Sequence, residues 1–212
     1  MAVVTVCVLI LCLSTVSAHE NSELYYWREY TGEIPHDALP GGVDADGQDT
    51  YIGEGYYHDN GFYIAQIYPG VKEVDLPCYG VKTATINIKI LCTESPESFH
   101  WVKTSSSTFK QDTADFELVV AGYDGNGNNG IMHVGRMFYQ GYVTVGDVTP
   151  WKTPHLWFPF NKIERAVNFY EVLVVREVEI EPRLRLDAET LSHETKDRAT
   201  PDFARLIFTF RA

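Results

Sequence analysis

The chain has 212 residues, of which 45% are hydrophobic, and it carries a formal net charge of −12. This charge argues against nucleic acids and anionic membrane surfaces as partners, because both attract clusters of lysine and arginine. With 13 tyrosines and 11 phenylalanines, the composition predicts a soluble, strand-rich protein with a hydrophobic core, organised as one domain or two small ones.

Residues 1–18 have the pattern of a secretory signal peptide. An apolar run from Ala2 to Leu13 is followed by the small residues Val16-Ser17-Ala18, which resemble a cleavage site. A membrane anchor is the weaker interpretation, because the run is shorter than the ~20 residues that a spanning helix needs. We therefore expect a secreted, extracellular protein without a membrane span.

The cysteines fit an oxidising compartment. Cys7 and Cys12 belong to the predicted signal peptide, which leaves Cys78 and Cys92 as an even pair. Because both lie in strand-like segments, we expect a disulfide between them, with two buried free thiols as the alternative. The spacing of cysteine and histidine does not indicate a metal site, and we expect no cofactor.

The remaining chain contains two diverged copies of one repeat. Residues 39–47 (LPGGVDADG) are echoed by residues 119–127 (VVAGYDGNG), and four further landmarks recur in the same order. The offset between copies drifts only from 80 residues at Gly42 to 82 residues at Leu91, as duplication with small insertions predicts. We expect a first repeat at 19–97, a second repeat at 98–176 and a C-terminal tail at 177–212.

Each copy consists of short strand-like segments separated by turn residues. Asp-Gly or Asn-Gly steps at residues 46–47, 60–61 and 126–127 favour hairpin turns, because asparagine and glycine accept positive φ. Residues 84–91 and 169–175 read as extended segments, and neither repeat contains a convincing 3.6-residue apolar period. The predicted fold is all-β, with two tandem, pseudo-symmetric antiparallel β repeats and a tail that contains edge strands.

The same landmarks carry a family resemblance. The order G-G-x-D-x-D-G, Y-[IV]-G, [IV]-x-P, aromatic-Pro and an [EK]-[VI]-L strand, found in residues 30–92 and in diverged form in 110–175, resembles the DM-nine repeat family, also called the natterin-like N-terminal domain. Trp101, near the start of the second unit, also matches. Members include mannose-binding lectins of bivalves, the front part of fish natterin toxins and secreted insect proteins linked to immunity. The resemblance implies a pseudo-symmetric all-β fold and a role in glycan binding or pattern recognition.

In the family's lectins, an aspartate of the G-G-x-D turn and a lysine before the [IV]-x-P step hold the sugar hydroxyls. The resemblance places Asp44 and Asp124 at the aspartate position, with Gln66 and Asp147 where the family has lysine. Gln66 still donates hydrogen bonds through its amide, whereas an ionised Asp147 only accepts them. Asp147 would also face Asp124 with like charge unless Arg136 lies between them. Asp44 with Gln66 is therefore the better candidate of the two sugar sites.

Aromatic residues beside the turns are candidates for stacking against sugar rings. Tyr57 and Tyr139 lie near the loop signals, although strand alternation alone places about half of such residues in the core. The two D-x-[DN]-G turns also space oxygen ligands as calcium loops do, but tight turns are the favoured interpretation.

The chain has no recognisable catalytic motif. It contains no G-x-S-x-G, no H-E-x-x-H, no phosphate-binding glycine loop and no dinucleotide fingerprint, so we do not expect an enzyme. We expect a secreted pattern-recognition protein that binds a carbohydrate or glycoprotein at one shallow site per repeat, with homodimers adding avidity. The alternatives are a toxin or membrane-acting component resembling natterins, and a secreted protein-interaction module without sugar binding.

Overall fold

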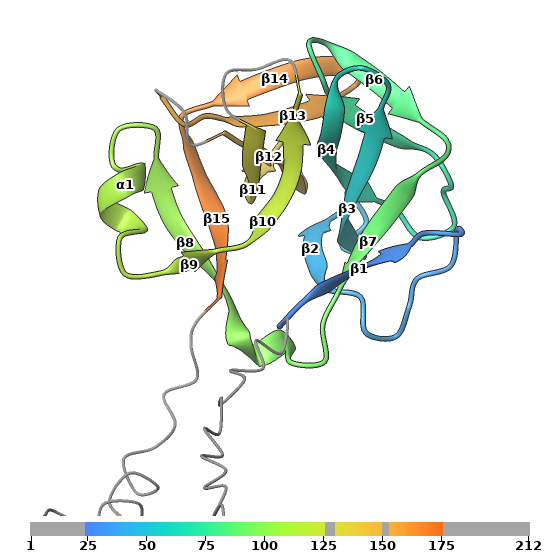
Figure 1. Ribbon diagram of the computed structural model, residues 1–212, viewed down its shortest axis with the longest axis horizontal. Coiled ribbons are helices and arrows are strands. Elements are labelled where there is room, and N and C mark those ends of the chain that lie inside the picture. The colour runs from blue at the N-terminus through green and yellow to red at the C-terminus, as the bar shows by residue number, and fades with distance from the viewer. Residues whose placement is uncertain (1–23, 126–129, 150–152, 176–212) are drawn as a thin grey trace, which may run out of the picture.

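The computed structural model describes residues 24–125, 130–149 and 153–175. The predicted signal peptide, the predicted tail at 177–212 and the turn at 126–127 lie outside the described residues. The described chain is folded almost entirely into antiparallel strands, so the predicted all-β fold is confirmed (Figure 1). Among these residues, no helix has the length and hydrophobicity needed to cross a bilayer.

The strands of the first half are β1 (Tyr26–Glu29), β2 (Pro40–Val43), β3 (Asp49–Tyr57), β4 (Gly61–Ile67), β5 (Val74–Pro77), β6 (Val81–Ala84) and β7 (Ile88–Cys92). The second half contains η1 (Pro96–Ser98), β8 (Phe99–Ser105), α1 (Phe109–Asp112), β9 (Glu117–Leu118), β10 (Val120–Asp124), β11 (Gly130–Tyr139), β12 (Tyr142–Val148), β13 (Leu156–Phe160), β14 (Ile163–Val167) and β15 (Phe169–Val175). Sequences such as GFYIAQI in β4 and YVTVGDV in β12 are rich in the β-branched and aromatic residues that favour strands.

Both halves pair their strands in the same way. In the first half, β3 pairs with β2, β4 and β7, and β7 pairs with β1. In the second half, β11 pairs with β10, β12 and β15, and β15 pairs with β8. Even the register agrees, since Trp27 lies opposite Leu91 and Trp101 lies opposite Leu173. The strand pairing thus follows the internal repetition of the sequence.

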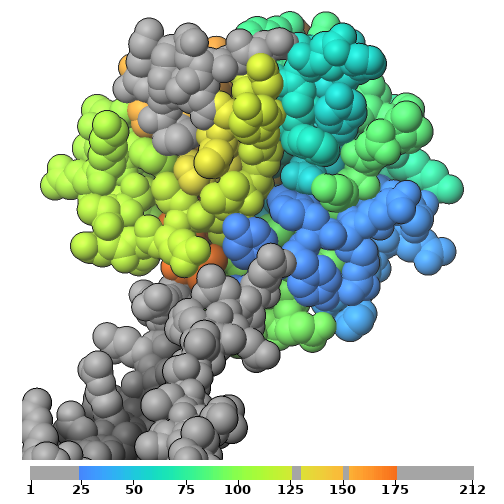
Figure 2. Space-filling model, viewed as in Figure 1, coloured from blue at the N-terminus to red at the C-terminus, as the bar shows by residue number. Residues whose placement is uncertain are grey.

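The two halves are joined by their equivalent strands. β2 pairs with β12 at Val43 and Val143, and β10 pairs with β4 at Tyr123 and Phe62. β2 and β10 are equivalent strands, and so are β4 and β12, so each half pairs with the other through the same two strands, and both halves share one 13-stranded sheet. Figure 2 shows the teal segment of the first half in direct contact with the yellow segment of the second.

Glycines of the repeated turn motif permit this close approach. A Cβ atom on Gly42 would lie 2.3 Å from the carbonyl oxygen of Val143. At the equivalent position, a Cβ on Gly122 would lie 2.8 Å from the carbonyl oxygen of Phe62, and Gly122 also has a φ of +82°. A side chain at Gly42 would therefore push β2 away from β12, and one at Gly122 would push β10 away from β4.

Two side chains bridge β4 and β12 between the halves. The Oε1 atom of Gln66 accepts a hydrogen bond from the backbone N–H of Val145 at 3.1 Å. The Oδ1 atom of Asp147 accepts one from the backbone N–H of Ile64 at 2.6 Å. Gln66 and Asp147 are equivalent residues of the two repeats, and both are buried. Because a buried unsatisfied amide costs about 1–3 kcal/mol, these acceptors stabilise the junction.

The hydrophobic core also spans the junction. Its larger cluster contains Ile52 and Ile64 from the first half together with Val134 and Val145 from the second, all with no exposed surface. Fully burying an aliphatic side chain of this size contributes about 1.5–3 kcal/mol. The halves are therefore held together by apolar packing as well as by strand pairing.

The hairpin turns predicted at residues 46–47 and 60–61 are present, with Gly47 at φ +81° and Gly61 at φ +124°. The extended run predicted from residue 84 to 91 is interrupted between β6 and β7. Asn87 adopts a φ of +54° there, so the chain turns before β7 begins.

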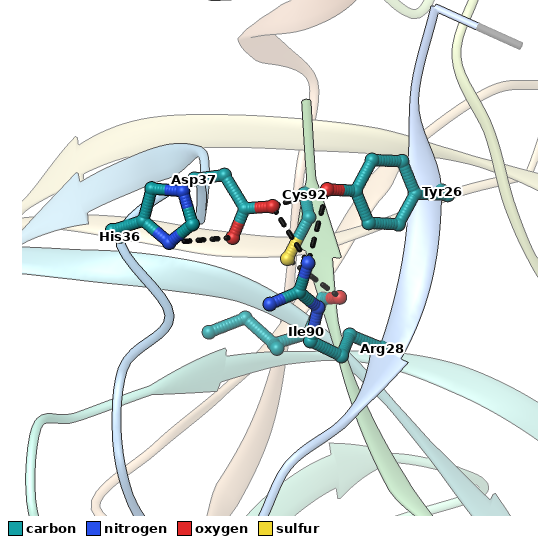
Figure 3. A network of polar contacts seen from close by, with 6 residues as sticks. All are labelled: Tyr26, Arg28, His36, Asp37, Ile90 and Cys92. Atoms are coloured by element: carbon teal, nitrogen blue, oxygen red, sulfur yellow. Dashed lines mark hydrogen bonds and ion pairs between the residues drawn. The ribbon is translucent and has the colours of Figure 1, made fainter. Parts of the chain in front are cut away.

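Cys78 and Cys92 do not form the predicted disulfide, because both thiols are free and buried. Cys78 follows β5, which belongs to the separate β5–β6 hairpin, whereas Cys92 ends β7 in the large sheet. Figure 3 shows the Cys92 thiol beside Asp37 and Tyr26. Burial raises the pKa of the Cys92 thiol to about 11, and the charge of Asp37 adds to this shift.

We expect Cys78 and Cys92 to be recovered as free thiols when the protein is unfolded without reductant. In the native protein both should react with an alkylating reagent far more slowly than in denaturant, because they are buried and the thiolate is the reactive form. Alkylation followed by peptide mass mapping measures this at each residue. A cross-linked Cys78–Cys92 peptide would contradict the structure.

The carboxyl group of Asp147 has an unusual environment for an acid. Its Oδ2 atom has no hydrogen-bond partner among the described residues. Burial raises the pKa of Asp147 well above its ordinary value, and the charges of Glu164 and Asp124 act in the same direction. The folded protein therefore holds this proton at pH values where the unfolded chain has lost it.

Replacing Asp147 by asparagine should stabilise the protein at neutral pH. The stability that the Asp147 proton contributes is complete below the ordinary pKa and is lost as pH rises toward the raised folded pKa. Asparagine keeps the acceptor for the Ile64 amide and has no proton to lose. Each unit of difference between the folded and unfolded pKa corresponds to about 1.4 kcal/mol.

Denaturant unfolding at about pH 4 and about pH 7.5 measures the effect. The stability advantage of Asp147→Asn over the unmodified protein should grow between these two values. The exposed Asp115→Asn substitution is the matched control and should leave the difference near zero. A constant or negative difference for Asp147→Asn would contradict the raised pKa.

Candidate ligand-binding site

A cavity of about 240 Å³ opens where the two halves meet. We call it the inter-repeat cavity and define it by six lining residues from both halves: Gln66, Tyr68, Asp75, Tyr142, Phe160 and Lys162. The residues come from the ends of β4 and β12, from β5, and from the β13–β14 hairpin. The cavity exists because the pairing of β2 with β12 and of β4 with β10 brings the hairpins of the two halves together.

Aromatic side chains supply its apolar walls. Tyr142 and Phe160 meet edge to face with ring centroids 5.5 Å apart, and Tyr68 leaves 37% of its surface exposed. Burial raises the pKa of the Tyr68 hydroxyl, and the nearby charge of Asp44 adds to the shift. Its hydroxyl is therefore a neutral hydrogen-bonding group at physiological pH.

An ion pair between the halves supplies the polar groups. The Nζ atom of Lys162 lies 2.7 Å from Oδ1 of Asp75, and this hydrogen bond raises the pKa of the lysine. Asp75 belongs to the first half, whereas Lys162 is contributed by the second. A carboxylate that accepts beside an ammonium that donates is a complementary pair for neighbouring hydroxyl groups.

Lys162 reaches the inter-repeat cavity from the turn that joins β13 to β14. Asn161 and Lys162 form a two-residue hairpin turn, with φ values of +52° and +57°. Asn161 is the signal that the sequence offers for this turn, because asparagine accepts positive φ. Even so, only the pairing of the halves brings this hairpin next to Asp75.

Asp124, which corresponds to Asp44 of the first repeat, is bonded by side chains of the protein itself. The hydroxyls of Tyr63 and Tyr79 donate to Oδ1 and Oδ2 of Asp124 at 3.0 and 2.8 Å. Burial and then the Asp124 hydrogen bond raise the pKa of Tyr79 to about 12. In the inter-repeat cavity the residues equivalent to these two tyrosines are the smaller Thr144 and Asn161.

Asp44 and Gln66 hold structure around the inter-repeat cavity. Oδ1 of Asp44 accepts from the backbone N–H groups of Asp46 and Gln48 at 2.9 and 2.8 Å, which fixes the turn. Gln66 lines the cavity, but its amide is bonded to the protein. Its Nε2 atom donates to Oγ1 of Thr50 at 2.7 Å, and its Oε1 atom accepts from the Val145 amide.

Asp147, by contrast, lies on the buried side of β12 and bonds the Ile64 amide. It is not brought together with Arg136, whose Nε atom lies 2.7 Å from Oε2 of Glu171. These two residues therefore do not assemble a sugar site with Asp124. The structural roles of Asp147 and Arg136 could not be predicted from the sequence, because each depends on a contact with a residue far away in the chain.

Neither aromatic residue predicted to stack against sugar lines the inter-repeat cavity. Tyr57 packs against the larger core cluster, with the Nζ atom of Lys82 5.7 Å from its ring centroid. Tyr139 lies edge to face with Phe158 and Phe160 at 5.3 and 5.0 Å. Tyr139 therefore acts indirectly, by supporting the Phe160 wall.

Comparison with known proteins bears on the fold alone. No protein-family model matches the chain, and no curated protein matches it by sequence. The crystal structure of the nematode sperm cell motility protein MFP2B resembles it with a TM-score of 0.51 and 11% sequence identity. The match covers 73% of this chain and 47% of the MFP2B chain, so this chain spans about half of that protein.

Proposed function

We propose that the protein is a secreted, non-catalytic glycan-binding protein of the pattern-recognition kind, with its sugar site in the inter-repeat cavity. The observation that carries this proposal is the Asp75–Lys162 pair beside the aromatic walls of Tyr68, Tyr142 and Phe160. Sugars present apolar C–H faces and hydrogen-bonding edges, so a site for them needs both kinds of surface.

The size and charge of the cavity narrow the ligand class. At about 240 Å³ it is smaller than the ~300–1,000 Å³ of pockets for drug-sized ligands, which suits one or two sugar units. Asp75 and Glu73 line it against a single ammonium of Lys162, and the whole chain is acidic. Acidic glycans meet repulsion there, so we propose neutral, mannose-type sugars as ligands.

Among the described residues we propose one open site, instead of one per repeat, because Tyr63 and Tyr79 already bond the Asp124 carboxylate. A shallow site of this kind binds a single sugar weakly, so homodimers would supply useful affinity by multivalency. Secretion is inferred from the signal-peptide pattern of residues 1–18.

Glycan-array binding tests the proposal, with Lys162→Met as the main variant. Losing a charged hydrogen-bond donor should weaken binding to neutral glycans about 10- to 100-fold. Asp75→Asn should weaken it as well, because it removes the carboxylate acceptor and the partner of Lys162. Thermal unfolding of each variant shows whether the fold is kept.

Lys110→Met is the matched control, because Lys110 is exposed on α1, outside the inter-repeat cavity. It should bind as the unmodified protein does. Equal binding by folded Lys162→Met, or no binding by the unmodified protein to any neutral glycan, would rule out this site.

A further inference from the structure

A second cavity, of about 460 Å³, lies on the first half of the molecule. It shares no lining residue with the inter-repeat cavity. Trp27 and Glu29 of β1 line it together with Tyr56 of β3, Phe62 of β4 and Lys89 of β7, and we call it the Trp27 cavity. Tyr56 and Phe62 contact each other with ring centroids 5.1 Å apart, so three aromatic side chains border one hollow.

The second half shows what occupies the equivalent strand positions there. Trp101 matches Trp27 in register, and the guanidinium of Arg136 lies 4.1 Å from the Trp101 ring centroid. Nε of Arg136 also lies 2.7 Å from Oε2 of Glu171 on the adjacent strand. A planar cation is therefore stacked on the tryptophan and paired with a carboxylate.

The charges are reversed across the same three strands of the first half. Glu54, Lys89 and Glu29 stand where the second half has Arg136, Glu171 and Lys103. Lys89 is drawn to Glu54 at 3.0 Å and lies over the Phe62 ring at 5.2 Å. Within residues 24–125, 130–149 and 153–175, the cation–ring contacts involve Tyr26, Tyr57, Phe62 and Trp101, and none involves Trp27.

Trp27 lies on a strand, β1, that is anchored by side-chain hydrogen bonds. Its strand is fastened by Asp37, which bonds the Tyr26 hydroxyl and accepts from Nη2 of Arg28 at 2.8 Å (Figure 3). The carboxylate of Glu29, two residues from Trp27, has no hydrogen-bond or ion-pair partner among the described residues. A stacking surface and an available carboxylate thus stand on one anchored strand.

We propose that the Trp27 cavity binds an arginine side chain of a partner protein, stacked on Trp27 as Arg136 is stacked on Trp101, with Glu29 as its carboxylate. The guanidinium stacks on the indole and donates to Glu29, while the arginine methylene groups lie against Tyr56 and Phe62. The net charge of −12 draws basic partners toward this surface. Lys89 does not oppose the incoming cation strongly, because Glu54 neutralises its charge.

The site prefers arginine over lysine for a geometric reason. A guanidinium is planar and stacks on indole while donating two parallel hydrogen bonds to one carboxylate, which an ammonium does not do. The inference is independent of the proposed sugar site, so the two proposals stand or fall separately.

Titration of the full protein with three blocked tripeptides tests the proposal, with arginine, lysine or citrulline between glycines. The readout is the indole N–H resonance of Trp27, assigned by its loss in Trp27→Phe. The arginine peptide should shift it in a saturable way, at least about 5-fold more tightly than the lysine peptide, and the neutral citrulline peptide should not. Glu29→Gln should weaken arginine binding about 10-fold.

The Trp101 indole is the internal control, because Arg136 already covers it. It should not respond in the unmodified protein, whereas Arg136→Ala should uncover it and add a second, arginine-dependent shift. Equal shifts of Trp27 with all three peptides, no shift with arginine, or full binding by folded Glu29→Gln would each overturn the proposal. So would a Trp101 response in Arg136→Ala without any Trp27 response.

Discussion

The structure depends on one close contact made twice, the approach of β2 to β12 and of its equivalent β10 to β4. Gly42 and Gly122 permit it, since a Cβ atom at either position would collide with a facing carbonyl oxygen. Gln66 and Asp147 then satisfy the buried amides between β4 and β12. The inter-repeat cavity follows from this geometry, because its ion pair joins a strand of one half to a hairpin of the other.

The two halves share a strand pattern but differ in how they use equivalent positions. In the second half, tyrosine hydroxyls occupy the Asp124 carboxylate and the guanidinium of Arg136 covers Trp101. The Trp27 cavity opens at the strand positions of the first half that correspond to Trp101 and its neighbours, and the inter-repeat cavity opens between the two halves. Polar groups satisfied within the chain contribute to stability, whereas open ones are available to a ligand. The contact between Arg136 and Trp101 is the basis of the proposal that the Trp27 cavity accepts a guanidinium.

Local pattern predicted the all-β class and the hairpin turns at Gly47 and Gly61, because each is encoded by neighbouring residues. The internal repetition was predicted from the similarity of segments about 80 residues apart. The pairing of strands between the two halves could not be predicted in this way, since no local period specifies which distant strand is the partner. For the same reason, neither the hydrogen bond that Gln66 accepts from the other repeat nor the Asp75–Lys162 ion pair could be predicted. The prediction of a disulfide was wrong because it used only an oxidising compartment and an even number of cysteines, and neither shows whether two thiols lie close together.

The pairing of strands between the two halves also affects how the chain folds. β2 and β4 each pair with β3 on one side and with β12 or β10 on the other, so a chain emerging from the ribosome cannot complete these pairings until residues near 148 are available. Such long-range pairing raises contact order and slows folding. It also means that two chains present at high concentration while folding hold the same complementary strands. Intermolecular exchange of whole repeats is therefore the characteristic misassembly of this architecture.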